Sequence, residues 1–164
     1  MFVIFISPIV LSWLVYLFHD RFHFKTANAG TLIKPPIQLS EVMTMRIHDR
    51  KWQIIFSIHD CHPHLETILF TLHQLRKALG EDQMRVELRL WNFENCQIMP
   101  TYDFQAVTFT SKQRRDLQKK LEMGRNQIFL VDPLGNLFMS YSVAAEPMGI
   151  YQDMKKVLVA SQIG

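Results

Sequence analysis

The spacing of apolar and polar residues changes period along the chain, and each change marks a predicted element. Residues 52–58, WQIIFSI, are apolar at most positions, as in a strand that is buried on both faces. Apolar residues then recur at helical spacing over residues 63–79, where Pro63 suits the first turn and Gly80 the stop. Apolar and polar residues alternate over residues 84–91, as in a half-buried strand. This part of the chain therefore predicts a strand, a helix and a second strand.

The C-terminal part predicts a helix, a hairpin and a final helix. Residues 111–124 are typical of a basic helix, with Ser111 as its cap. A buried strand at residues 127–132 runs into the turn DPLGN, and residues 137–142 form its hairpin partner. Apolar residues at helical spacing over residues 150–158 predict the last helix.

This order of elements is that of an α/β thioredoxin-like domain, which we assign to residues 50–164. The initial strand–helix–strand unit should have a right-handed crossover. In this fold the chemistry lies at the end of the first strand and the N-terminus of the first helix. Cys61 occupies that place.

The beginning of the chain has a different composition. Residues 1–18 carry no charged side chain, and eighteen helical residues span about 27 Å, close to the hydrocarbon thickness of a bilayer. We predict a transmembrane helix over residues 1–18. The stretch that contains Gly30, Pro35 and Pro36 shows no helical period, so we predict an extended tether over residues 19–49.

A cleaved signal peptide is the alternative, because Ala27-Asn28-Ala29 has the small-x-small form of a cleavage site. The apolar run is longer than a usual signal core and charged residues separate it from that site, so we favour a retained anchor. Basic residues lie only on the C-terminal side of the run, which by itself places that side in the cytoplasm.

Composition narrows the function further. The 164 residues are 48% hydrophobic and 20% charged, with a formal net charge of +3, which suits one ordinary domain and predicts no nucleic-acid partner. Two cysteines allow at most one bridge and do not identify a compartment. The chain contains no Walker A, dinucleotide-binding or nucleophile-elbow motif.

The stretch SIHDCHPHLE, residues 57–66, contains the candidate chemistry, namely His59, Cys61, His62 and His64. Histidine and cysteine are ligands that suit copper and zinc. Residues 62 and 64 cannot both point the same way as Cys61 on one helical face, so we do not expect the full set to act together. The alternative is a group of exposed polar residues around a helix start.

The two cysteines also suggest redox chemistry. Cys61 at a helix N-terminus should have a lowered pKa and be reactive. A single thiolate cannot carry out dithiol–disulfide exchange without a second thiol. Cys96 follows the second predicted strand and is able to approach Cys61, but nothing in the spacing demands that the two pair.

Several stretches resemble one known family. They are the apolar segment followed by NAGTLIKPP, the central DCHPHLETILFTLHQLRKALGEDQMRV, and the C-terminal QIFLVDPLGNLFMSY and GIYQDMKKVLVASQIG. The chain is similar to the membrane-anchored, thioredoxin-like proteins of Proteobacteria found with cytochrome c oxidase genes, distant relatives of the Sco/SenC copper chaperones. The resemblance implies a single-pass inner-membrane anchor, a domain in the periplasm, an accessory role in oxidase assembly, and oxidase subunits or assembly factors as partners.

The sequence departs from this family at its site. The family pattern C-x-x-x-C requires a second cysteine where this chain has Leu65, and residues 122–126 hold no histidine where the Sco relatives have one. Met123 lies in that stretch, and a thioether suits Cu(I). The resemblance therefore implies a degenerate site with no catalytic residue, and either no cofactor or weakly held copper.

Three hypotheses follow. The first is a scaffold that has lost its dithiol. The second is a copper-binding chaperone that uses Cys61 with a nearby histidine or Met123. The third is a thiol oxidoreductase that acts through Cys61 and Cys96.

Overall fold

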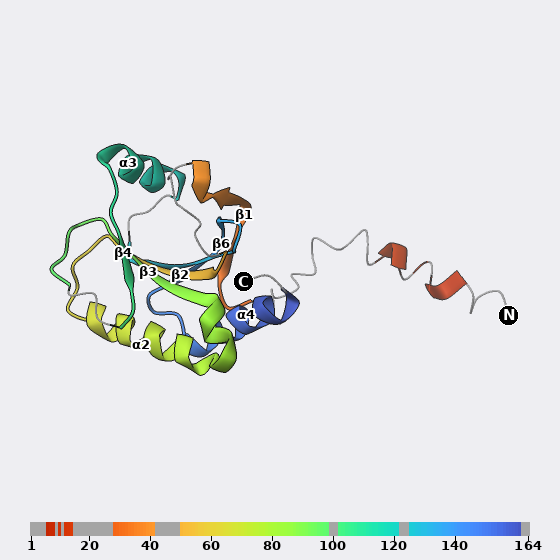
Figure 1. Ribbon diagram of the computed structural model, residues 1–164. Coiled ribbons are helices and arrows are strands. Elements are labelled where there is room, and N and C mark those ends of the chain that lie inside the picture. The colour runs from red at the N-terminus through yellow and green to blue at the C-terminus, as the bar shows by residue number, and fades with distance from the viewer. Residues whose placement is uncertain are drawn as a thin grey trace.

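The fold was analysed in a computed structural model, which describes residues 6–8, 10, 12–14, 28–41, 50–98, 102–121 and 125–161. These residues form a six-stranded mixed sheet in the order β1-β6-β5-β2-β3-β4, with helices on both faces (Figure 1). The strands are β1 (Thr31–Gln38), β2 (Trp52–Ile58), β3 (Val86–Asn92), β4 (Gln105–Val107), β5 (Gln127–Val131) and β6 (Asn136–Ser142). The helices are α2 (Leu65–Ala78), α3 (Ser111–Lys120) and α4 (Pro147–Ala160), with 3-10 helices η1 (Leu39–Glu41) and η2 (Gly80–Arg85).

The central strand is β2, and all seven of its residues are buried. It pairs in parallel with β3 and antiparallel with β5. Strands β5 and β6 form an antiparallel hairpin, which confirms the hairpin that the sequence predicts. The junction of the first predicted strand and helix is also confirmed, because Cys61 lies between β2 and α2.

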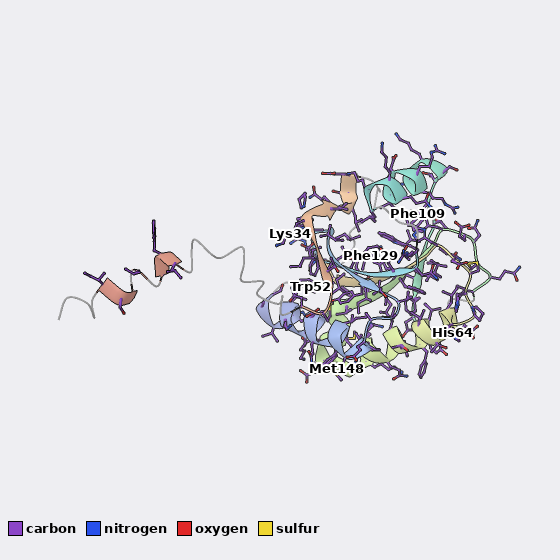
Figure 2. All side chains as sticks on the ribbon, turned by 180° about the vertical axis from the view of Figure 1, so that it is seen from behind. Lys34, Trp52, His64, Phe109, Phe129 and Met148 are labelled. Carbon is purple, nitrogen blue, oxygen red and sulfur yellow. A yellow bond between two sulfur atoms is a disulfide. The ribbon has the colours of Figure 1, made fainter. Side chains whose placement is uncertain are left out.

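The sheet separates two apolar cores (Figure 1). One core packs between the sheet and helices α2 and α4, with Leu69 and Met154 as fully buried members. The other lies under α3 and contains Leu117 of that helix together with aromatic side chains such as Phe129. Figure 2 labels Phe129. The loop that follows β2 emerges where the two cores end.

Three element boundaries differ from the sequence prediction. Helix α2 begins at Leu65, two residues later than predicted. Met84 lies in η2 and is 68% exposed, so the alternating strand begins only at Val86. The cap of α3 is Thr110 instead of Ser111: its side chain accepts from the main chain of Gln113, whose side chain accepts in return from the main chain of Thr110.

The predicted tether is wrong over β1. Residues 31–38 form an edge strand of the sheet, paired antiparallel with β6 from Thr31 opposite Ser140 to Gln38 opposite Asn136. The residues just before β1 are also held, because the carboxylate of Asp153 in α4 accepts the main-chain N–H groups of residues 29 and 30 at 2.7 and 3.1 Å. The sheet therefore extends well upstream of residue 50.

The predicted membrane span lies largely outside the described residues, since only residues 6–8, 10 and 12–14 of the first 18 are described, and these are helical. Within the part of the chain that the structure describes, no helix is both long and apolar enough to cross a bilayer.

Candidate functional site

A disulfide joins Cys61 to Cys96, with the two Cα atoms 5.6 Å apart. Cys61 lies in the turn after β2, and Cys96 lies in the segment after β3. Strands β2 and β3 are parallel neighbours, and their last residues, Ile58 and Asn92, face one another in the sheet. The loops that follow the two strands therefore begin at the same end of the sheet. The predicted strand–helix–strand unit already placed the ends of these two strands at the same end of the sheet. It did not predict the path of either loop beyond the strands.

The two cysteines differ in exposure. Cys61 is exposed, whereas Cys96 is 9% exposed and belongs to the core under α2 and α4. Leu65, which stands where the family pattern has its second cysteine, is buried in that same core at 4% exposure. The cysteine that pairs with Cys61 therefore comes from a different element than the family pattern has it.

Asn92, the last residue of β3, holds the main chain of Cys96. Its side-chain oxygen accepts from the Cys96 N–H at 3.0 Å, and its amide nitrogen donates to the Cys96 carbonyl at 2.9 Å. Asn95 has a φ of 51°, a left-handed conformation that asparagine tolerates better than most residues. The chain can therefore turn back toward Asn92.

Asn126, the residue before β5, holds the other side of the disulfide. Its side-chain oxygen accepts from the main-chain N–H groups of His59 at 2.6 Å and Asp60 at 2.9 Å. Its amide nitrogen donates to the Asp60 carbonyl at 2.9 Å. From the sequence, residues 122–126 drew attention for a missing histidine and for Met123, not for Asn126. The signal it overlooked is an amide side chain directly before a strand that neighbours β2.

His59 points away from the disulfide. Its Nε2 lies 2.8 Å from the hydroxyl of Ser57, and its ring stacks on Phe93 with centroids 4.6 Å apart. Burial of the ring lowers the pKa of His59 below its usual value; Glu94 opposes this shift and Arg114 adds to it. Phe93 belongs to the core under α3, so His59 and Cys96 are directed to opposite faces of the sheet.

His62 and His64 are exposed neighbours. His64 lies at the N-terminal end of α2 (Figure 2). Their ring centroids are 5.0 Å apart, and the His64 N–H donates to Nδ1 of His62 at 3.3 Å. Both line an open cleft of about 780 Å³. The cleft is also bordered by Asp60, Asn126 and Thr31, the first residue of β1.

Of the candidate metal ligands that the structure describes, His62 and His64 are neighbours, whereas Cys61 and His59 are engaged elsewhere. The sulfur of Cys61 is bonded to Cys96, His59 packs on Phe93, and His62 and His64 line the cleft. Among the described residues, no group of three His, Cys, Asp or Glu side chains is arranged to hold a metal ion. Met123 lies outside the described residues. In the oxidised form neither cysteine offers a thiolate to a metal, because both sulfurs are in the disulfide.

The mixed sheet, the helices on both faces and a disulfide at the end of the central strand define a thioredoxin-like protein. Residues 52–161 match the family described as transmembrane-like, thioredoxin-like, C-terminal domain. The match covers most of the chain, so this protein belongs to that family.

Solved structures agree on the fold, and several of them belong to the Sco family. A Sco protein from Thermus thermophilus in its apo form has a TM-score of 0.60 at 15% identity, over 82% of this chain and 99% of that one. BsSco, a Sco-family cytochrome c oxidase assembly protein described with a disulfide switch, has a TM-score of 0.50 at 12% identity, over 77% and 93%. Comparison with curated proteins gives no match. At these identities the likeness concerns the fold alone.

Proposed function

We propose that this protein is a membrane-anchored thiol–disulfide protein that acts through Cys61 and Cys96 in the assembly of a respiratory oxidase. The observation that carries the proposal is the disulfide between an exposed and a buried cysteine at the site position of the fold. The scaffold hypothesis depended on a missing second cysteine in the helix. Cys96 supplies that cysteine, so the thiol hypothesis now has the stronger support.

The chemistry is an exchange in two steps. In the reduced protein, the Cys61 thiolate attacks one sulfur of a partner disulfide, which forms a mixed disulfide and releases the first partner thiolate. The Cys96 thiolate then attacks the Cys61 sulfur, which closes the intramolecular bond and releases the second partner thiolate. Two electrons pass from this protein to the partner, and a partner dithiol reverses both steps.

The different exposure of the two cysteine residues supports a different role for each. A partner contacts Cys61 because it is exposed, and Cys96 is sheltered from an incoming disulfide by the core around it. Cys61 lies four residues before the first residue of α2 and so is outside its first turn. The helix dipole therefore favours its thiolate less than the sequence alone suggested, because that effect fades within one turn.

Location and partners form the second part of the proposal. We propose that residues 1–18 anchor the protein in the inner membrane and that the domain faces the periplasm. A disulfide persists in an oxidising compartment such as the periplasm, which supports this side against the cytoplasmic side that the basic residues favour. The partners would be oxidase subunits or assembly factors that carry a cysteine pair. The disulfide switch described for BsSco supports thiol chemistry on this fold.

Trapping tests the roles of the two cysteines. The full chain in detergent is reduced, freed of reductant and mixed with a small disulfide such as oxidised glutathione. We expect Cys96→Ser to accumulate a mixed disulfide on Cys61, whereas Cys61→Ser accumulates none and the unaltered protein only passes through this state. Mass spectrometry distinguishes these products. Equal trapping by the two variants, or a wild-type protein that never reforms its disulfide, would contradict the proposal.

A further inference from the structure

Two asparagine side chains form hydrogen bonds with the main chain near the disulfide. Asn92 binds the main chain of Cys96, and Asn126 binds the main chain just before Cys61. We infer that Asn92 and Asn126 are positioning residues, which set the equilibrium between the reduced and oxidised forms of the Cys61–Cys96 pair. This inference rests on the proposed thiol–disulfide function. The inference adds that the redox equilibrium of the cysteine pair is set by hydrogen bonds from Asn92 and Asn126 to main-chain atoms, none of which is a bond to sulfur.

The contacts of Asn126 tie together parts of the chain that are far apart in sequence. Its partners, His59 and Asp60, are 67 and 66 residues away. Three hydrogen bonds link this one amide to the main chain of two consecutive residues, both just before Cys61. The turn after β2 is thereby fastened to the start of β5. No atom of Cys61 takes part, so these bonds can persist when the disulfide is reduced.

The contacts of Asn92 are local but reach the cysteine itself. The side chain binds both the N–H and the carbonyl of Cys96, four residues further along. The Cys96 carbonyl also accepts from the N–H of Ile98 at 2.8 Å, which fixes the chain after the cysteine. Asn92 is itself fixed as the last residue of β3. The main chain of Cys96 is therefore held to the sheet independently of its sulfur.

Holding both main chains affects the redox equilibrium because forming a disulfide brings two thiols together. Where the two thiols are already held near each other, closing the bond costs less conformational entropy, and the disulfide forms more readily. Losing the hydrogen bonds of either asparagine should leave the oxidised form almost unchanged, since the covalent bond still holds the loops. The conformational entropy of the reduced form should rise. The equilibrium should then shift toward the dithiol.

The test is the redox equilibrium of Asn92→Ala and Asn126→Ala in the full chain in detergent. Each protein is equilibrated with glutathione buffers of graded ratio, and its thiols are alkylated and counted by mass spectrometry. We expect each variant to lower the equilibrium constant for disulfide formation by about tenfold, which is about 30 mV for a two-electron couple. Asn126→Asp keeps the oxygen that accepts from His59 and Asp60, so we expect it to stay within about threefold of the unaltered protein.

Asn136→Ala provides a matched control. The side chain of Asn136 donates to Asp132 at 2.8 Å in the turn between β5 and β6. That turn lies at the opposite end of the sheet, because Val131 pairs with Gln53 and Gln127 pairs with Ser57 near the disulfide. Its loss should lower the unfolding midpoint without changing the equilibrium constant.

The outcomes separate the inference from the proposed function. If Asn92→Ala and Asn126→Ala lower the unfolding midpoint but keep an equilibrium constant within twofold of the unaltered protein, both residues are merely structural and the inference is wrong. If an alanine variant does not fold, Asn92→Ser and Asn126→Ser, which also lack the amide that makes these hydrogen bonds, are compared, and no shift in either has the same meaning. If the unaltered protein does not exchange with glutathione at all, the proposed function itself fails.

Discussion

The hydroxyl of Tyr141 donates to the carboxylate of Asp153 at 3.1 Å, and both side chains are buried. The same carboxylate accepts the N–H groups of Ala29 and Gly30 and an ion-pair contact from Lys156. One acidic side chain thus joins β6, α4 and the chain that enters β1. The stability of the contacts between β1, β6 and α4 should therefore depend on the negative charge of Asp153.

We expect Asp153→Ala to lower the free energy of unfolding by about 2–4 kcal/mol, because it leaves the buried Tyr141 hydroxyl and two part-buried N–H groups without their acceptor. Burial by itself raises the pKa of Asp153, but the hydrogen bonds from Lys156, Gly30, Ala29 and Tyr141 outweigh it, so the pKa is lowered overall. A lowered pKa in the folded state contributes stability above the unfolded value of about 3.9 and loses it as the pH falls through the folded value. Urea unfolding at pH 7 and in steps below pH 4 measures both effects.

Asp116→Asn is the control for this prediction, since Asp116 is exposed on α3. It should leave the unfolding curves at pH 7 nearly unchanged. A wild-type protein that loses no more stability in acid than Asp153→Ala does would show that the carboxylate contributes little.

The disulfide should contribute substantially to stability. It closes a loop between residues separated by 35 positions, for which chain-entropy arguments give about 3–4 kcal/mol. We therefore expect a reductant to lower the free energy of unfolding by about this amount. Urea unfolding with and without the reductant measures it, and a Cys61→Ser/Cys96→Ser double variant should be indifferent to the reductant. Identical curves for the oxidised and reduced wild-type protein would show that the reduced chain is equally well held.

Copper affinity tests how far the site has departed from its relatives. The reduced chain offers two thiols, one on the exposed Cys61 and one on the buried Cys96, and we expect weak Cu(I) binding in competition with a chelator. Leu65→Cys adds a third soft ligand in the core that already contains Cys96, so its affinity should be at least about tenfold higher. Tight binding by the unaltered reduced protein, abolished in Cys61→Ser, would instead establish a working copper site.

The placement of the domain can be tested by reporter fusion. A reporter that is active only in the periplasm, joined after Gly164, should be active if residues 1–18 anchor the protein as proposed. A cytoplasmic reporter at the same position should be silent. The opposite pattern would mean that the basic residues after the apolar run determine the orientation.

Sequence periodicity predicted the elements that bury a regular face. Strand β2 is buried along its whole length, and the β5–β6 hairpin is marked by its turn, so both were identified. Strand β1 was missed because it is largely exposed and contains Pro35 and Pro36, so it shows no apolar alternation. Its pairing with β6 is a tertiary contact, and no local pattern encodes it.

The site was predictable only in part. The position of Cys61 followed from the order of elements, whereas its bond to Cys96 depends on how two loops continue beyond adjacent strands. Residue type drew attention to the histidines, but His59 turns toward the core under α3. The residues that hold the disulfide loops, Asn92 and Asn126, are chemically unremarkable in the sequence. Their role comes from the main-chain groups that the fold presents to them.

The first residue of β1 has a consequence for where this protein can act. Thr31 borders the same cleft as His62 and His64, so the chain from the proposed anchor joins the sheet beside the redox site. Between residues 18 and 31 a fully extended chain spans at most about 45 Å. If residues 1–18 anchor the protein as proposed, this short connection keeps Cys61 within a thin layer next to the membrane. A partner would then have to present its sulfur within that layer, whatever its affinity for the domain.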